Sequence, residues 1–148
     1  MPSQPINILL ADDDENDRML FKEAFEELKI KTIVFTVNNG TQLMDYLKAK
    51  NTILPDILFL DLNMPRKNGL ECLKEIRANK KLKNISIAIY STSASENDIV
   101  ETFCLGANVY INKPSDFASL KEVLSKTVIT AHQFQDTPFN KENFLLRI

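Results

Sequence analysis

Short apolar runs alternate with helix-like segments five times along the chain. The apolar runs have the length and composition of buried strands, and they lie at residues 6–11, 31–37, 56–61, 85–91 and 107–111. Each is followed by a stretch whose apolar residues recur every three or four positions, which predicts an amphipathic helix. Strands that alternate with helices favour βαβ units, and near-continuous apolar strands are typical of a parallel sheet covered on both faces. The pattern predicts a doubly wound (βα)5 domain of the α/β class.

The length of the chain favours one globular domain. A chain of 148 residues is long enough to build one core of its own. We expect a single domain over residues 1–148, with its core at about 5–130 and a C-terminal tail at 131–148. Because the tail is rich in aromatic and apolar residues, we expect it to pack onto the domain or onto a partner, and it leaves a homodimer open.

Composition narrows the classes of partner and compartment. The chain has 18 basic and 20 acidic residues and a formal net charge of −2, which offers no electrostatic basis for binding nucleic acid. No apolar run approaches the roughly 20 residues that cross a bilayer, and the N-terminus lacks the features of a signal peptide. We expect a cytoplasmic protein without membrane contact.

Cys72 and Cys104 lack CxxC spacing, which favours buried free thiols over a disulfide or a metal site.

Polar side chains stand at the carboxyl ends of four of the five predicted strands. They are Asp12, Asp13 and Asp14 after the first strand, Asp61 after the third, Ser91 and Thr92 after the fourth, and Asn112, Lys113 and Pro114 after the fifth. In an open parallel sheet, ligands and chemistry collect at this edge. An ionised carboxylate at the end of an apolar strand needs compensation nearby, so Asp61 is the most informative member of the set.

Each of these groups also has a purely structural explanation. The acidic run can be a helix N-cap with favourable charges, above all at Asp14. Ser91 and Thr92 can be turn residues, and Lys113 can be an ordinary solvated lysine. The convergence of four strand ends nevertheless favours a functional site at the carboxyl edge of the sheet.

The set supports one coherent chemistry. Closely spaced carboxylates repel one another unless a cation lies among them, and hard oxygen ligands suit Mg²⁺. With the cation bound, Asp61 can stay ionised and attack phosphorus, which forms an aspartyl phosphate. Mg²⁺ and the ammonium of Lys113 would neutralise charge on the transferring phosphoryl group, and Ser91 can donate a hydrogen bond to one of its oxygens.

Four segments carry a known pattern in order and spacing: LLADDDENDR, FLDLNMPRKNGLE, IAIYSTSAS and YINKP. Asp61 precedes Ser91 by 30 residues, and Ser91 precedes Lys113 by 22. In these segments, over about residues 5–130, the sequence resembles the receiver domains of two-component response regulators. The resemblance implies the CheY-like, flavodoxin-like fold, with a five-stranded parallel sheet flanked by helices. The chain is similar to stand-alone receivers, some of which partner phytochrome-type kinases.

The resemblance implies a role for each acidic residue of the set. Asp61 corresponds to the phosphoacceptor, and Asp12 and Asp13 correspond to the acidic pair that binds Mg²⁺. Asp13 is expected to be a direct ligand, and Asp12 to act through water. Asn63 is expected to offer its backbone carbonyl to the metal.

The resemblance also assigns the lysine and the switch residues. Lys113 corresponds to the family's lysine, and the Lys113–Pro114 bond is expected to be cis. Ser91 corresponds to the switch hydroxyl, and Tyr110 to the aromatic residue that swings inward when this hydroxyl engages the phosphoryl group. Thr92 stands where the family often has alanine, which is expected to crowd phosphoryl access slightly.

A relay function follows from the resemblance. Its implied partners are a sensor histidine kinase or phosphotransfer protein and a downstream protein target, which would read the face of the fourth helix, fifth strand and fifth helix. The chain is not expected to be an enzyme: Asn63 and Ser93, which would flank the hydrolytic water, carry no charge, so at most weak self-dephosphorylation is expected. Two alternatives are a phosphorylation-independent adapter with a receiver fold, and a phosphatase. The phosphatase lacks support because such enzymes typically carry an aspartate where this chain has Asn63.

Overall fold

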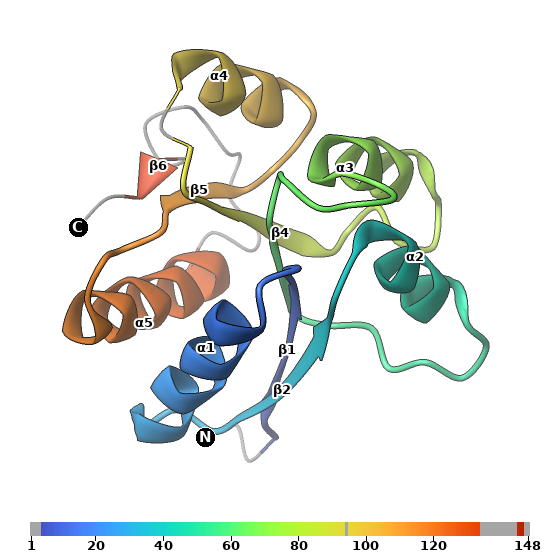
Figure 1. Ribbon diagram of the computed structural model, residues 1–148. Helices are drawn as coiled ribbons and strands as arrows, with labels where there is room; N and C mark the ends of the chain where they lie inside the picture. The colour runs from blue at the N-terminus through green and yellow to red at the C-terminus, as the bar shows by residue number, and fades with distance from the viewer. Residues whose placement is uncertain (1–3, 94, 134–144, 147–148) are drawn as a thin grey trace.

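The computed structural model describes residues 4–93, 95–133 and 145–146. It contains strands and helices in the predicted alternation (Figure 1). The strands are β1 (Ile6–Ala11), β2 (Thr32–Val37), β3 (Ile57–Leu60), β4 (Ser86–Ser91), β5 (Val109–Asn112) and β6 (Leu145–Leu146). The helices are α1 (Glu15–Glu27), α2 (Gly40–Lys48), α3 (Gly69–Ala78), α4 (Glu96–Cys104) and α5 (Phe117–Gln133). The predicted α/β class and doubly wound (βα)5 order are confirmed.

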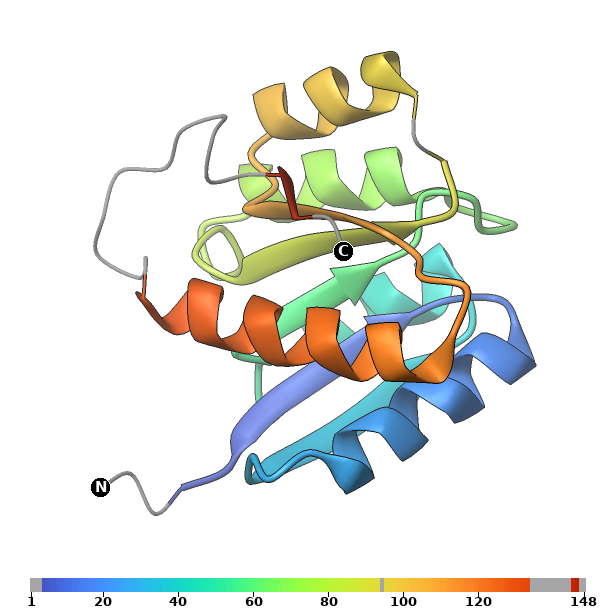
Figure 2. The ribbon, with the colours of Figure 1, turned by 90° about the vertical axis from the view of Figure 1, so that its left-hand side faces the viewer.

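One twisted parallel sheet forms the centre of the molecule, in the order β2-β1-β3-β4-β5-β6. Helices α1 and α5 cover one face, and α2, α3 and α4 cover the other (Figures 1 and 2). Each face therefore has its own apolar layer. Leu9 and Leu58 pack into the layer under α2, α3 and α4, whereas Ile8 and Phe59 pack into the layer under α1 and α5. Strand β3 is buried along its whole length, because helices cover it on both sides.

The sheet differs from the prediction at one edge, where β6 adds a sixth strand. Leu145 and Leu146 pair in parallel with Tyr110 and Ile111 of β5. The sequence alone did not indicate this strand, because two apolar residues in a tail are too few to distinguish strand from loop. The pairing places this part of the tail on the domain itself. The aromatic residues of the tail (Phe134, Phe139 and Phe144) lie outside the described residues.

Polar N-caps begin the first four helices where the chain leaves the sheet. Asn68 and Glu71, three residues apart, form a reciprocal capping box at the start of α3. Ser95 caps α4, because its side-chain oxygen accepts a hydrogen bond from the Asp98 N–H. Each cap satisfies a backbone N–H group that has no partner within its helix. The caps thereby define where each loop after a strand ends.

The two cysteines have different environments. Cys72 is a buried free thiol, as predicted, and burial raises its pKa to about 11. The prediction of a buried Cys104 was wrong, because this residue ends α4 on its exposed side while Ile99 and Thr102 fill the buried side. Within the described ranges, no helix is both long enough and apolar enough to cross a bilayer.

Candidate functional site

The carboxyl ends of β1 and β3 bring Asp12 and Asp61 side by side. The two strands pair in parallel, and their last paired residues are Ala11 and Leu60. The residue that follows each strand therefore projects from the same edge of the sheet. The Asp61 backbone N–H donates to the carbonyl of Ala11 at 3.0 Å, which extends the pairing by one step.

Asp12, Asp13 and Asp61 form an acidic cluster at this edge. One carboxylate oxygen from each lies within 4.8 Å of the others. Asp12 is fully buried and Asp61 is 6% exposed, whereas Asp13 faces solvent. Three carboxylates at this spacing, two of them buried, form a donor set of hard oxygens, which fits a divalent cation.

Burial makes the two inner carboxylates weaker acids than usual. Burial is the largest cause that raises the pKa of Asp61 to about 6, against the lowering effect of the nearby Lys113 ammonium. Burial also raises the pKa of Asp12, although Lys113 and the backbone of Asp14 donate hydrogen bonds to it. A bound cation would favour the ionised forms of both groups.

Gly69 allows the start of α3 to approach the acidic cluster closely. A Cβ atom at this position would lie 2.4 Å from the carbonyl oxygen of Asp61 and 2.8 Å from Cα of Leu62. The Gly69 N–H also donates to the carbonyl of Leu62 at 3.0 Å. Asn63 lies in this turn, and its N–H donates to Oδ1 of Asp61 at 3.3 Å. The predicted contribution of the Asn63 carbonyl to a metal stays a prediction.

Lys113 reaches into the acidic cluster from the end of β5. Its Nζ lies 2.8 Å from Oδ2 of Asp12, 2.9 Å from Oδ2 of Asp17 and 3.6 Å from Oδ2 of Asp61. The Lys113 side chain is only 10% exposed, which rules out the alternative that it is an ordinary lysine surrounded by solvent. Burial alone would lower the pKa of Lys113, but its hydrogen bonds to Asp12 and Asp17 outweigh that effect and raise the pKa.

The predicted cis bond between Lys113 and Pro114 was wrong, since no peptide bond among the described residues is cis. The trans form is the lower-energy one for most bonds to proline. With this bond trans, the Lys113 N–H donates to the Ser91 carbonyl at 2.8 Å. The ammonium still reaches Asp12 and Asp17, so the lysine points inward without the predicted isomer.

Asp17 is the site residue that the sequence analysis missed. It lies in the first turn of α1, four residues after Asp13, and it shares the Lys113 ammonium with Asp12. Side chains in a helix tilt toward its N-terminus, so a first-turn carboxylate leans back over the strand end that precedes the helix. The cap at Asp14 marks where the helix begins, and that signal was available in the sequence.

The predicted switch residues Ser91, at the end of β4, and Tyr110, in β5, both contact Ser93 in the loop that follows β4. Ser91 is fully buried, and its Oγ accepts a hydrogen bond from the Ser93 N–H at 3.1 Å. Tyr110 is also fully buried, and its hydroxyl donates to the Ser93 carbonyl at 2.8 Å. Thr92 is exposed. Ser93 therefore connects the predicted switch hydroxyl to the predicted switch aromatic, while any movement of Tyr110 stays a prediction.

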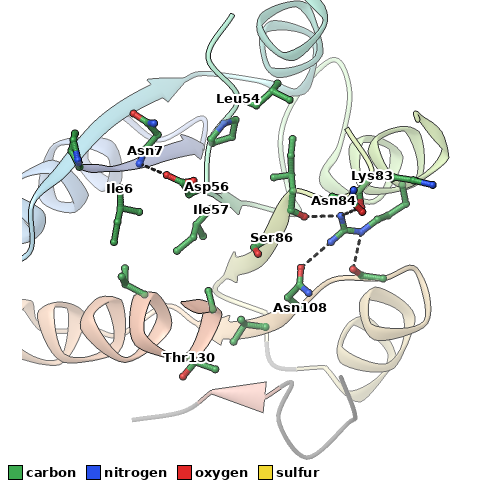
Figure 3. Close-up of a pocket in the computed structure, with 18 of the residues that line it drawn as sticks. Ile6, Asn7, Leu54, Asp56, Ile57, Lys83, Asn84, Ser86, Asn108 and Thr130 are labelled. Carbon is green, nitrogen blue, oxygen red and sulfur yellow. Dashed lines mark hydrogen bonds between the residues drawn. The ribbon is translucent and has the colours of Figure 1, made fainter. Parts of the chain in front are cut away.

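A wide pocket of about 860 Å³ lies at the opposite end of the sheet, where the strands begin (Figure 3). Asn7 and Asp56 stand on its wall, joined by a hydrogen bond of 2.7 Å from the Asn7 N–H to Oδ2 of Asp56. Arg77 also lines the pocket, and it donates to the carbonyls of Lys83 and Ile85. This pocket contains none of the predicted site residues.

Known proteins share both the sequence pattern and the fold. The family described as "Response regulator receiver domain" matches residues 8–125. Response regulator Rcp1 of Synechocystis is 32% identical over 120 residues, which cover 78% of this chain and 82% of Rcp1. The crystal structure of the phosphorylated cyanobacterial phytochrome response regulator RcpA is 32% identical, with a TM-score of 0.79, and the alignment covers 90% of this chain and 96% of RcpA. The Mn²⁺-bound form of Rcp1 is 28% identical, with a TM-score of 0.76, and 92% of this chain and 99% of that chain align.

The acidic cluster, the inward lysine and the parallel sheet that brings them together agree with these similarities. The family match spans the sheet from β1 to β5 and extends into α5. This chain therefore belongs to the response regulator receiver domains of two-component systems.

Proposed function

We propose that the chain is a phosphorelay response regulator that accepts a phosphoryl group on Asp61 with the help of Mg²⁺. The observation that carries the proposal is the arrangement of one buried carboxylate, Asp61, between two further carboxylates and an ammonium 3.6 Å away. Two similar structures, one of a phosphorylated response regulator and one of a response regulator bound to Mn²⁺, support the proposal for this chain.

Mg²⁺ would be held by Asp12, Asp13, Asp61 and the backbone carbonyl of Asn63, and it would supply positive charge next to the transferring group. Asp61 is the nucleophile: one of its oxygens forms a bond to phosphorus as the bond between phosphorus and the donor breaks. The donor is the imidazole of a histidine kinase or phosphotransfer protein, or a small acyl phosphate. The leaving group departs with the bonding electron pair.

Lys113 and Ser91 would stabilise the transferred group. The Lys113 ammonium already lies beside Asp61, so it neutralises charge on a phosphoryl oxygen at little cost in reorganisation. The Ser91 hydroxyl is bound by the Ser93 N–H, and a phosphoryl oxygen on Asp61 would be a new acceptor for the Ser91 proton. Because Ser93 also binds Tyr110, movement of Ser91 would be passed to the surface formed by α4, β5 and α5.

The chain would act through protein contacts and not as an enzyme. We propose a cytoplasmic relay with two partners, a sensor histidine kinase or phosphotransfer protein and a downstream protein target, and without contact to nucleic acid or membrane. Asn63 and Ser93 lack a charged group that could activate water, so self-dephosphorylation would be slow. A homodimer is a further part of the proposal, based on the aromatic and apolar composition of the C-terminal tail.

The test is phosphorylation by acetyl phosphate in the presence of Mg²⁺, measured by intact-protein mass spectrometry and Phos-tag electrophoresis. We expect one phosphoryl group on the wild-type protein and none on Asp61→Asn or when EDTA replaces Mg²⁺. Asp45→Asn, which removes an exposed carboxylate on α2, is the matched control and should react like the wild type. Equal labelling of Asp61→Asn, or a wild type that is never labelled, would contradict the proposal and favour an adapter that works without phosphorylation.

A further inference from the structure

The Lys113 ammonium contacts three carboxylates, and one of them lies outside the acidic cluster. Asp12 and Asp61 belong to the cluster with Asp13, but Asp17 does not. The ammonium is hydrogen-bonded to Asp12 and Asp17, whereas its 3.6 Å separation from Asp61 is an ion-pair distance. Asp17 therefore binds this lysine without being one of the carboxylates that could hold a cation.

The first turn of α1 fixes the position of Asp17. The Asp17 N–H donates to Oδ1 of Asp14, the N-cap, at 2.9 Å. The next residue, Arg18, donates from Nη1 to the backbone carbonyl of Asp12 at 2.9 Å, which ties this turn to the end of β1. A helix N-terminus also favours a negative charge in its first turn. Local structure therefore holds the Asp17 carboxylate where it meets the ammonium.

An aromatic ring also contacts the Lys113 ammonium. Nζ of Lys113 is 5.1 Å from the centre of the Tyr90 ring, a distance at which a cation is attracted to an aromatic face. The Tyr90 ring is 4% exposed and packs edge-on against Phe21 and Phe59 in the core. Asp17 and Tyr90 together give the ammonium two contacts outside the acidic cluster.

An ammonium and a divalent cation seek the same carboxylate oxygens. If Asp17 did not bind Lys113, the ammonium would be drawn toward Asp12 and Asp61 alone, the two buried carboxylates of the cluster. A metal would then have to displace it. We propose that Asp17 is a positioning residue: it holds the Lys113 ammonium beside the acidic cluster so that the lysine and a divalent cation do not compete for Asp12 and Asp61. The inference rests on the proposed function only in taking Mg²⁺ as the cation of the cluster.

The first experiment is a Mg²⁺ titration of the full chain, followed by amide chemical shifts in NMR spectra. We expect Asp17→Asn to weaken Mg²⁺ binding roughly 3- to 10-fold, because the ammonium can then move into the cluster and compete with the metal. Glu15→Gln removes one exposed charge from the same helix turn and should change the affinity less than about 2-fold. Asp17→Glu should restore part of the loss. Equal effects of Asp17→Asn and Glu15→Gln would overturn the proposal.

A double-mutant cycle tests whether Asp17 acts through the lysine. In a Lys113→Met background there is no ammonium to position, so Asp17→Asn should weaken Mg²⁺ binding no more than Glu15→Gln does. An undiminished effect in that background would mean that Asp17 is only a nearby charge, which would overturn the proposal.

A direct view of the ammonium keeps the test independent of folding defects in the double variant. With ¹⁵N-labelled lysine, the Lys113 ammonium signal of the wild type should remain protected from solvent exchange both with and without Mg²⁺. In Asp17→Asn, Mg²⁺ should displace the ammonium, and the signal should be lost when the metal is added. A signal in Asp17→Asn that survives Mg²⁺ would overturn the proposal.

The outcomes separate this inference from the proposed function. A wild type that binds Mg²⁺ but is never phosphorylated would contradict only the proposed function. A wild type that is phosphorylated, together with an Asp17→Asn variant that binds Mg²⁺ as tightly, would contradict only the role of Asp17. A wild type that binds no Mg²⁺ would contradict both.

Discussion

Asp61 is a site residue whose buried carboxylate reduces the stability of the folded protein at neutral pH. Its carboxyl group is almost fully buried, and this burial raises its pKa to about 6. The folded protein therefore favours the protonated form more than the unfolded chain does. This preference for protonated Asp61 stabilises the folded protein at pH 4. The stabilisation is lost as the pH rises through about 6, and it is absent at pH 7. In the metal-free protein at neutral pH, the ionised Asp61 lowers the free energy of unfolding.

Replacing Asp61 with asparagine should remove this unfavourable ionisation. At pH 7 in EDTA, we expect Asp61→Asn to raise the free energy of unfolding by about 1–3 kcal/mol, the size that a shift of about two pKa units implies. Near pH 4 the difference should disappear, since wild-type Asp61 is then protonated. Urea denaturation at both pH values measures the effect. Asp45→Asn, at an exposed position, is the control, and an equal gain at pH 4 and pH 7 would contradict the explanation.

At the scale of single elements, α3 begins directly beside the site. It begins at Gly69, directly against the backbone of Asp61 and Leu62. Its capping box holds the N-terminus in place, because the side chains of Asn68 and Glu71 each accept from the backbone of the other. A helix start that is both capped and closely packed determines the course of the loop that carries Asp61 and Asn63.

Gly69→Ala should disturb this loop through the packing of α3. The added Cβ would lie 2.4 Å from the Asp61 carbonyl oxygen, so the helix start or the loop must move. We expect a loss of about 1–3 kcal/mol in the free energy of unfolding, typical of overpacking, together with weaker Mg²⁺ binding. Urea denaturation and NMR titration measure the two effects. A variant with wild-type stability and wild-type Mg²⁺ affinity would show that the loop tolerates the change.

Asn68→Ala should affect the same helix through its cap alone. Loss of the side-chain acceptor leaves the Glu71 N–H without its hydrogen bond, which we expect to reduce the free energy of unfolding by about 1 kcal/mol. Asn97→Ala, at an exposed position in the first turn of α4, is the matched control and should cost less. Thermal and urea denaturation measure the loss of stability in each variant. Equal losses in Asn68→Ala and Asn97→Ala would argue against the importance of the cap.

At the scale of the whole molecule, the parallel sheet collects its charged groups at one edge. The acidic cluster brings three carboxylates together, with one ammonium beside them. Such a cluster destabilises the metal-free fold through repulsion. A cation that binds the folded chain and not the unfolded chain should therefore stabilise it by mass action.

Saturating Mg²⁺ should raise the Tm of the wild type by several degrees. In Asp13→Asn the rise should be smaller, because one ligand of the cation is weakened while the buried core is unchanged. Differential scanning calorimetry in EDTA and in Mg²⁺ measures both values. A Tm of the wild type that is the same in the two conditions would contradict the assignment of the cluster as a cation site.

Sequence and structure agree most closely where the chain is periodic. The five strand–helix alternations could be predicted because buried strands appear as short continuous apolar runs, whereas amphipathic helices have apolar residues every three or four positions. The strand-end residues Asp12, Asp61 and Lys113 were readable as one group because parallel strands must end at a common edge. The caps at Asn68 and Ser95 were readable because capping depends on residues only three positions apart.

The differences arise where contacts join distant parts of the chain. The pairing of Leu145 with Tyr110 and the hydrogen bond from Lys113 to Asp17 connect residues far apart in sequence, so no local pattern indicates them. The exposure of Cys104 depends on which side of α4 faces the sheet.

The sequence by itself determined the fold class and the edge of the sheet that carries the strand-end residues Asp12, Asp61 and Lys113, since apolar periodicity and the residues that follow each strand are local features of the chain. Only the tertiary structure decided how the charges are shared there. It holds Lys113 between Asp12 and Asp17 and leaves it 3.6 Å from Asp61. The physical reason is that an ammonium binds whichever carboxylates the packed helices and strands bring within reach, and that distance is a property of the folded chain alone.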